Sequence, residues 1–325
     1  MRSIGHGDGR LSRSIARWSR AALFFAAAAL LLLMAGGAVL ALATGSAPVS
    51  AAPAALALAA VSYLAGHVVR IARLALIAAD DRVSLRLLGR VHLFTAGAGL
   101  AIPFKLGDVY RAVELSAALG GVARAVIVIF VERALDVALI LALLLLALWS
   151  GAARPADYGP VLAASGLFVA VAVFAVAFLP DNLRRLASYV IRRYDAEWTV
   201  AALRRVANAR SVLHDAGQML RGRFAALVAL TLLIWGLELL AMGAVLAGAA
   251  AAAEPVATLI TFLSALIRGD TLLGQLAPGA AGRNGPVATS YLLATQVPLV
   301  FAALVAAVRL ARLRLAPLVQ ARITT

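Results

Sequence analysis

Long unbroken runs of apolar residues dominate this chain, and they limit its fold more than any motif does. A helix needs about 20 apolar residues to cross about 30 Å of hydrocarbon. The runs reach that length without the alternation of a half-buried strand or the one-sided pattern of a half-buried helix. Soluble domains are about half apolar and about a quarter charged, whereas this chain is 63% hydrophobic and 14% charged. The sequence therefore predicts an all-α integral membrane protein.

Six runs are predicted to form full transmembrane helices within one membrane domain, 21–310. They are 21–43, 54–69, 125–149, 159–180, 224–249 and 287–308. The apolar core of a signal peptide is shorter than the first run, so we interpret that run as an uncleaved span. The remaining parts are a basic amino terminus (1–20), an amphipathic segment (181–223) and a basic tail (311–325).

Positive charge is distributed unevenly between the predicted loops. The formal net charge is +15, and 23 of the 29 arginines fall in four segments. These segments are 1–20, 70–90, 181–223 and 309–325. Cytoplasmic loops carry such an excess, so we expect both termini in the cytoplasm of a bacterium and the chain in its inner membrane. Basic residues that flank spans favour anionic lipid headgroups as partners and argue against nucleic acid.

The charge pattern leaves two segments, 91–124 and 256–286, that each enter and leave the membrane on one side. Their predicted helix breaks are Pro103 in the first segment and Pro278, Gly279 and Gly282 in the second. Matching breaks in two halves of a chain are typical of a transporter's central site. We therefore expect two re-entrant hairpins in an inverted repeat, which gives up to eight membrane segments. The alternative is two ordinary hairpins of kinked helices.

Ionisable side chains inside the spans mark a candidate site, because a charge near the bilayer centre costs at least about 2.5–3.5 kcal/mol. Glu132, Arg133 and Asp136 lie in the span 125–149. Glu132 and Asp136 are four residues apart on one helix face, so they need a cation between them or a bound proton. We expect Arg111 or Lys105 to supply that cation.

Glu238 lies near the middle of the span 224–249, and no oppositely charged residue accompanies it there. We expect its partner to be Arg268 or Arg283. Together with Glu132, Arg133 and Asp136, it is predicted to form an intramembrane charge network or to carry protons.

A third group follows the first helix break and is predicted to bind a lipid phosphate. Lys105, Asp108, Arg111 and Glu114 recur every three residues, and Gly107 lets a headgroup approach the backbone. Free N–H groups at a helix start favour phosphate, and an arginine can bind its oxygens with two parallel hydrogen bonds. We expect Arg283 to join them. The alternative for all of these charges is a buried ion-pair network that only holds the helices together.

Other polar residues are interpreted as less important. His67 is expected at a membrane interface, and His92, Arg70 and Arg73 suggest no site of their own. No metal-binding spacing is present, and no metal or other cofactor is expected. There is no cysteine, no phosphate-binding loop and no nucleophile motif, so we do not expect an enzyme. Acid–base chemistry by Glu132 and Asp136 stays open as an alternative.

The motifs resemble those of the lysylphosphatidylglycerol synthase transmembrane (flippase-like) family over residues 20–310. A Pro-x-x-x-Gly-(Asp/Glu)-x-x-Arg signature is matched by Pro103, Gly107, Asp108 and Arg111. A Glu-Arg-x-x-Asp signature is matched by Glu132, Arg133 and Asp136. The Pro/Gly-rich third signature is matched by Pro278, Gly279 and Gly282, but a glutamate expected near Gly285 is missing.

The resemblance implies a lipid translocator that moves a phospholipid or a polyprenyl-phosphate-linked lipid. It also implies a stand-alone membrane domain without the aminoacyltransferase domain. Two alternatives remain open, a membrane enzyme or accessory subunit in lipid or glycan assembly, and a scaffold for such enzymes. Spans rich in small residues also permit a homodimer.

Overall fold

The computed structural model describes residues 8–43, 51–81, 83–102, 106–150, 155–193, 197–248 and 281–323. Within these ranges every regular element is a helix: ten α-helices and one short 3₁₀ helix. The helices are α1 (Asp8–Ala43), α2 (Pro53–Ile77), η1 (Ala79–Asp81), α3 (Leu85–Ala101), α4 (Leu106–Ala118), α5 (Val122–Trp149), α6 (Pro155–Ala177), α7 (Leu179–Arg193), α8 (Glu197–Leu220), α9 (Phe224–Gly248) and α12 (Ala281–Ile323). The all-helical fold class is therefore confirmed.

Five helices are long and apolar enough to cross a membrane, which makes the chain a multi-pass membrane protein. Their candidate spans are Arg20–Leu40, Pro53–Ile77, Gly159–Ala177, Phe224–Gly248 and Thr289–Arg314. The remaining predicted span, 125–149, corresponds to α5, a helix of 28 residues. Its first half carries Glu132, Arg133 and Asp136, so its composition is too charged to qualify on apolarity alone.

The first broken segment forms two short helices that pack against each other. α3 ends at Ala101, where the extended backbone of Ile102 (φ −86°, ψ 118°) stops the helix, and α4 begins at Leu106. A Cβ on Gly107 would lie 3.2 Å from the Cα of Gly99, so the two helices approach through backbone alone. A helical hairpin is therefore present. That this hairpin is re-entrant, entering and leaving a membrane on one side, stays a prediction.

Most of the second broken segment lies outside the described residues, including Pro278, Gly279 and Arg268. Gly282 stands in the first turn of α12, so a helix begins at that position. The inverted relation between the two segments therefore stays a prediction as well.

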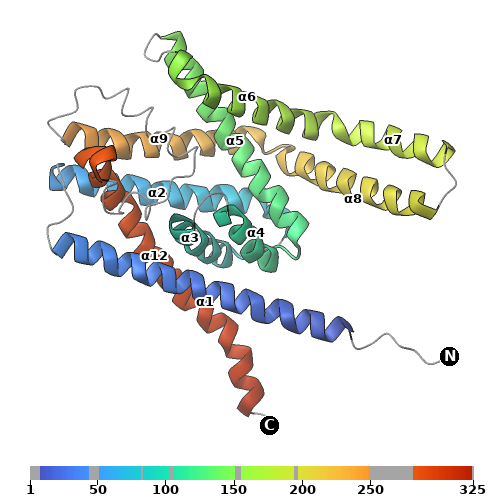
Figure 1. Cartoon of the computed structure of the whole chain (residues 1–325), viewed down its shortest axis with the longest axis horizontal. Helices are drawn as coiled ribbons and strands as arrows, with labels where there is room; N and C mark the ends of the chain where they lie inside the picture. Colours follow the sequence, from blue (N-terminus) through green and yellow to red (C-terminus); the bar gives the residue numbers. More distant parts are fainter. Residues whose placement is uncertain are drawn as a thin grey trace.

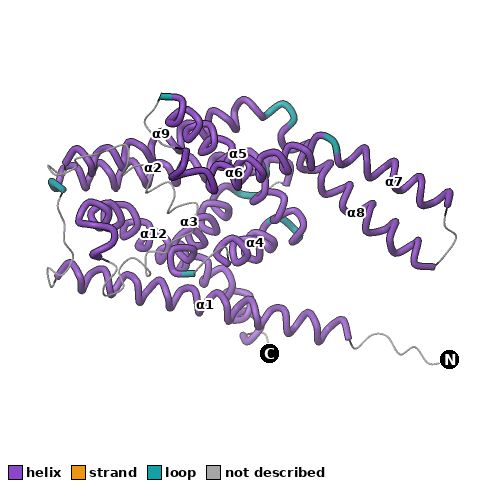
Figure 2. Tube along the Cα trace, turned by 45° about the horizontal axis from the view of Figure 1, so that its top comes forward, coloured by secondary structure: helices purple, strands orange, loops and turns teal. Residues whose placement is uncertain are grey.

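Helix α2 lies at the centre of the core and packs along α9 for most of its length. Helix α12 packs against both α2 and α3 (Figure 1). Helix α1 lies on the opposite side of α12 and α3 from α9 (Figure 2). At Gly97 of α3 there is no room for a Cβ, because the side chain of Ala303 on α12 occupies that place. These close helix contacts position the polar side chains of α2, α3, α4, α5 and α9 around one another.

Two ion pairs join three helix ends. Arg223, just before α9, donates to both carboxylate oxygens of Asp80 at 2.7 and 3.0 Å. Nε of Arg124 on α5 donates to Asp81 at 3.0 Å. The hydrogen bonds from Arg223 lower the pKa of the exposed Asp80 carboxyl below its usual value. The end of α2 and the starts of α5 and α9 thus lie together, as the charge pattern predicts when it places them on one side.

Helices α7 and α8 cover most of the amphipathic segment 181–223. Phe178 continues the hydrogen-bond pattern between α6 and α7, since its N–H donates to Phe174 and its carbonyl accepts from Asn182. Helix α7 therefore runs on from α6, and α8 folds back beside it, so that the pair projects from the bundle (Figure 1).

Candidate functional site

Two arginines on α2 lie at the centre of the candidate site. Arg70 and Arg73 are three residues apart, so their side chains leave the same face of the helix. Arg73 is only 2% exposed, although it lies in a helix long enough to be a span. Burial of a guanidinium is costly unless acceptors surround it. The partners of both arginines therefore define the site.

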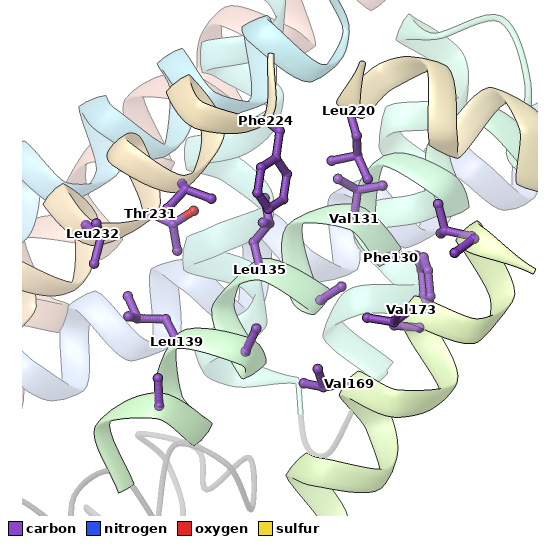
Figure 3. Close-up of a pocket in the computed structure, with 17 residues that line it drawn as sticks. Phe130, Val131, Leu135, Leu139, Val169, Val173, Leu220, Phe224, Thr231 and Leu232 are labelled. Carbon is purple, nitrogen blue, oxygen red and sulfur yellow. The ribbon is translucent and has the colours of Figure 1, made fainter. Parts of the chain in front are cut away.

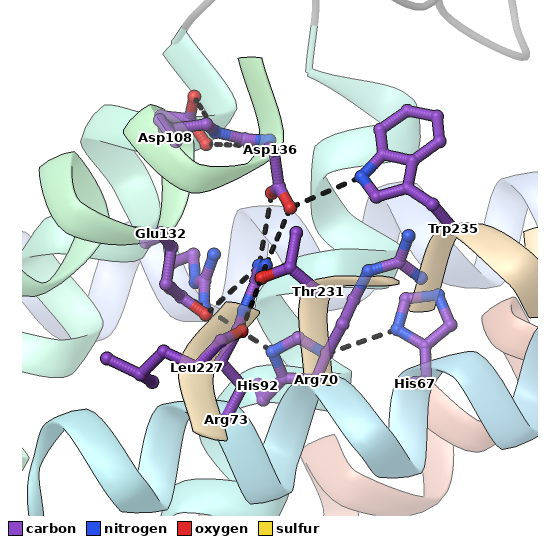
Figure 4. Close-up of polar contacts among 12 residues, drawn as sticks. His67, Arg70, Arg73, His92, Asp108, Glu132, Asp136, Leu227, Thr231 and Trp235 are labelled. Atoms are coloured by element: carbon purple, nitrogen blue, oxygen red, sulfur yellow. Dashed lines mark hydrogen bonds and ion pairs between the residues drawn. The ribbon is translucent and has the colours of Figure 1, made fainter. Parts of the chain in front are cut away.

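Arg73 is held by α5 and α9. Its Nη1 and Nη2 donate to the two carboxylate oxygens of Asp136 at 2.6 and 3.1 Å, and Nη1 also donates to the hydroxyl of Thr231 at 3.0 Å. The indole Nε1 of Trp235 lies 3.4 Å from the same carboxylate (Figure 4). Nη2 of Arg73 is also 3.8 Å from Glu132.

Glu132 is paired with Arg111. Nη2 of Arg111, on α4, donates to Oε2 of Glu132 at 2.7 Å. The expected cation beside Glu132 and Asp136 is therefore present, and two arginines supply it rather than one. Arg111 was expected there, whereas Arg73 was not. Lys105 lies outside the described residues.

Glu238 finds its partner on α2. Nη2 of Arg70 donates to Oε1 at 2.6 Å, and the hydroxyl of Tyr291 on α12 donates to Oε2 at 3.0 Å. Arg268 or Arg283 was expected as the partner, and among the described residues Arg70 pairs with Glu238. Arg268 lies outside the described residues, as does the side chain of Arg283. A neighbouring helix thus supplies the compensation that the glutamate lacks in its own helix.

Two further ion pairs lie on α4, away from the α2 arginines. Asp108 accepts from both Nε and Nη2 of Arg133 on α5, and the Arg133 side chain is nearly half exposed. Buried Glu114 accepts from Arg314 of α12, whose guanidinium also lies 4.4 Å from the ring centre of Phe24. The regularly spaced charges on α4 therefore lie on two faces of the helix. Asp108 and Arg111 form ion pairs with α5, and Glu114 forms an ion pair with α12.

Two histidines lie next to the arginines. Nδ1 of His67 on α2 lies 3.1 Å from Nε2 of His92 on α3, and both are buried. Nδ1 of His92 is 3.5 Å from Nη2 of Arg111. His67, which was expected at a membrane interface, is buried among the helices of the bundle.

The charges of this central cluster balance, while some of its hydrogen-bond donors have no acceptor. Arg70, Arg73 and Arg111 face Glu132, Asp136 and Glu238. Among the described residues, no acceptor reaches Nε of Arg73 or Nε of Arg111, and no partner reaches Nε2 of His67. A buried donor without an acceptor costs about 1–3 kcal/mol, so the cluster is prepared to accept a further oxygen-bearing group.

An apolar cavity adjoins the cluster. It has a volume of about 440 Å³ and lies between α5, α6 and α9, with Leu220 of α8 at one edge (Figure 3). Of the described residues that line it, Thr231 alone is polar, and its hydroxyl accepts the hydrogen bond from Arg73. The apolar cavity and the polar cluster therefore meet at Thr231.

The importance of Arg70, Arg73 and His67 was underestimated because the second predicted span ended at residue 69. Helix α2 continues to Ile77, and its buried positions recur at helical spacing on both sides of the arginines. They include Ser62, Gly66, His67, Arg73, Leu74 and Ile77. The apolar Leu74 and Ile77 beyond the arginines were the signal in the sequence that the span had not ended.

A comparison with protein families gives a match along most of the chain. The model described as the lysylphosphatidylglycerol synthase TM region matches residues 18–306. This range includes every described residue of the central cluster. Neither a curated protein nor a solved structure matches the chain.

Proposed function

Since the chain belongs to the lysylphosphatidylglycerol synthase transmembrane family, we propose that it translocates a phosphate-bearing lipid across the bacterial cytoplasmic membrane. The substrate class is a phospholipid or a polyprenyl-phosphate-linked lipid. The protein moves this lipid without making or breaking a covalent bond, and its termini face the cytoplasm.

The observation that carries the proposal is the junction between buried arginines and an apolar cavity. A lipid has a charged headgroup joined to long apolar chains, and this junction offers an environment for each. Binding sites are commonly apolar cavities of about 300–1,000 Å³ with a few polar groups that fix orientation. At about 440 Å³, this cavity holds part of an acyl or prenyl chain, while Thr231 leads to the guanidinium groups.

The free guanidinium donors support a phosphate at the polar end. Nε of Arg73 and Nε of Arg111 have no acceptor among the described residues, and arginine matches two phosphate oxygens with parallel hydrogen bonds. Arg111 is the residue on which we base the headgroup role, because it stands on α4 directly after the hairpin break. Glu132, Asp136 and Glu238 hold the arginines in place and balance their charge while no lipid is bound.

Reconstitution into liposomes tests the proposal. Nitrobenzoxadiazole-labelled phosphatidylglycerol and a labelled polyprenyl-phosphate sugar are placed in the membrane, and dithionite quenching measures how fast the label crosses. We expect faster crossing of at least one of them than in empty liposomes. If neither lipid crosses faster, the translocator proposal fails, and a new product formed from the lipid-linked sugar would instead support an enzyme.

Substitution of Arg111 tests the site. Loss of one charge-assisted hydrogen bond of about 1.5–3 kcal/mol corresponds to about a 10- to 100-fold slower rate in Arg111→Gln. Arg111→Lys keeps the charge without the two-pronged geometry, so we expect an intermediate rate. Arg86→Gln, at an exposed position on α3, is the matched control and should leave the rate unchanged. An unchanged rate in folded Arg111→Gln would remove this residue from the headgroup role.

A further inference from the structure

The two buried histidines form a row with Arg111. His67 and His92 come from different helices and meet at 3.1 Å between Nδ1 and Nε2, and Nδ1 of His92 faces Arg111 at 3.5 Å (Figure 4). The last distance is at the long end of the hydrogen-bond range. The proposed headgroup role of Arg111 does not require either histidine, so their presence in the cluster calls for its own explanation.

The donors around this row assign its protons. A guanidinium can only donate, so Nδ1 of His92 accepts from Arg111, and His92 is neutral with its proton on Nε2. That proton is donated to Nδ1 of His67, which therefore carries its own proton on Nε2. Nε2 of His67 has no partner among the described residues. One lone pair in this row can bind a new proton while the hydrogen bond between the two histidines stays intact. It is the lone pair on Nδ1 of His92.

The helices that pack around the pair carry several charged and titratable groups. From α2 come Tyr63, whose ring contacts His67, and the arginines Arg70 and Arg73. From the other helices come Arg111 and Glu114 on α4, Glu132 and Asp136 on α5, Glu238 on α9 and Tyr291 on α12. Helix α1 contributes Arg20 at an exposed position. Three nearby guanidinium groups oppose a further positive charge on the pair, so the histidines stay neutral while the site is empty.

An anionic headgroup reverses this balance. The arginines and carboxylates of the cluster already match in number, so a phosphate that enters adds one uncompensated negative charge. The carboxylates are poor places for a compensating proton, because each of them is already paired with at least one guanidinium group. The lone pair on Nδ1 of His92, which is engaged only in the long 3.5 Å contact with Arg111, is the available proton site beside the proposed phosphate position.

Resting on the proposed function, we infer that the His67–His92 pair takes up one proton when an anionic lipid headgroup binds to Arg111. The proton comes from water and is bound at Nδ1 of His92. The Arg111–His92 hydrogen bond cannot persist once both groups carry a proton at that contact. Proton uptake therefore frees one N–H of Nη2 of Arg111 for the phosphate, while the other N–H still donates to Glu132. Binding of the headgroup and of the proton therefore support each other, and a lower pH favours the loaded state.

Calorimetry on the whole protein in detergent micelles measures the proton directly. Dioctanoylphosphatidylglycerol is titrated in at pH 7.5 in buffers that differ in their enthalpy of ionisation, and the slope of the heat against that enthalpy counts the protons. We expect uptake of about one proton per lipid, since the row offers a single lone pair, on Nδ1 of His92, for a new proton. Dioctanoylphosphatidylcholine brings no net charge and should cause no uptake. Binding of the phosphatidylglycerol without proton uptake would overturn this inference and leave the translocator proposal intact.

Three variants locate the proton. His92→Asn keeps an acceptor toward Arg111 but cannot be protonated, so its uptake should fall to zero. His67→Gln leaves Nδ1 of His92 in place and should retain the uptake. His214→Asn changes an exposed histidine on α8 and is the matched control with full uptake. Retained uptake in His92→Asn would overturn the assignment. If the wild-type protein neither binds nor moves any of the lipids, the proposed function itself fails, and this inference fails with it.

Discussion

At the scale of single residues, Arg73 shows how the cluster tolerates charge inside an apolar helix. Its guanidinium and the Glu132 side chain are each 2% exposed, and its donors reach Asp136 and Thr231. Removal of one partner from a buried ion pair costs far more than replacement of both, because an uncompensated charge remains. A buried ion pair can therefore be costly to break even where the intact pair adds little net stability to the fold.

Asp136→Leu should therefore lower the free energy of unfolding by about 3–5 kcal/mol, whereas Arg73→Met combined with Asp136→Leu should recover most of that loss. Unfolding by sodium dodecyl sulfate in mixed micelles measures both. Asp181→Leu, an exposed carboxylate on α7, is the control and should stay within about 1 kcal/mol of the wild type. A double variant that is less stable than Asp136→Leu would contradict this account of the pair.

Local spacing predicted some of these residues and not others. Glu132 and Asp136 could be placed on one face, because residues four apart on a helix are neighbours. Arg73 lies 63 residues before Asp136 and Arg70 lies 168 residues before Glu238, and only the packing of α2 against α5 and α9 brings them together. Sequence spacing within one helix carries no information on such partners.

At the scale of helices, the approach of α3 and α4 sets the position of Arg111. Gly107 and Gly99 let the two backbones meet, and Asp108 and Arg111 follow Gly107 by one and four residues. The break between these helices could be predicted, because proline and glycine interrupt an apolar segment there. The tight contact could not, since it depends on a glycine of α3 that no motif includes.

Gly107→Val should displace α4, because its Cβ would meet the backbone of Gly99 at 3.2 Å and the larger side chain needs still more room. We expect about 1–3 kcal/mol lower stability, as for overpacking in a core, and slower lipid crossing. Gly99→Ala is the matched control, since nothing lies within 4 Å of the Cβ it would add. Thermal unfolding and the liposome assay measure the two effects, and equal behaviour of both variants would contradict the role of this contact.

At the scale of the whole molecule, the pairs Asp80–Arg223 and Asp81–Arg124 hold three helix ends together. The apolar runs predicted the membrane class, and the loop charges predicted that these ends share a side. The length of α2 was harder to predict, since its buried arginines interrupt the apolar run from which a span is identified.

The Asp80–Arg223 pair predicts a dependence of stability on pH. The pKa of Asp80 is lowered in the folded protein, so its stabilising contribution is present above the unfolded pKa of about 3.9 and is lost as the pH falls through the lower folded value. The melting temperature of the wild type should therefore exceed that of Asp80→Asn at pH 7, and the difference should vanish in acid below the folded pKa. A difference that persists there would show that the aspartate acts in some other way.

Helix α12 makes polar contacts at two places far apart along its length. Its 43 residues span about 65 Å at about 1.5 Å per residue, roughly twice the hydrocarbon thickness. Ala303, which fills the place of a Cβ on Gly97, lies almost midway between Tyr291, bonded to Glu238, and Arg314, bonded to Glu114. If the segment between Tyr291 and Arg314 tilts about this contact, its two ends move in opposite directions. Such a tilt would displace the partners of Glu238 and Glu114 together. A structural change at one end of α12 would therefore be coupled to the other end.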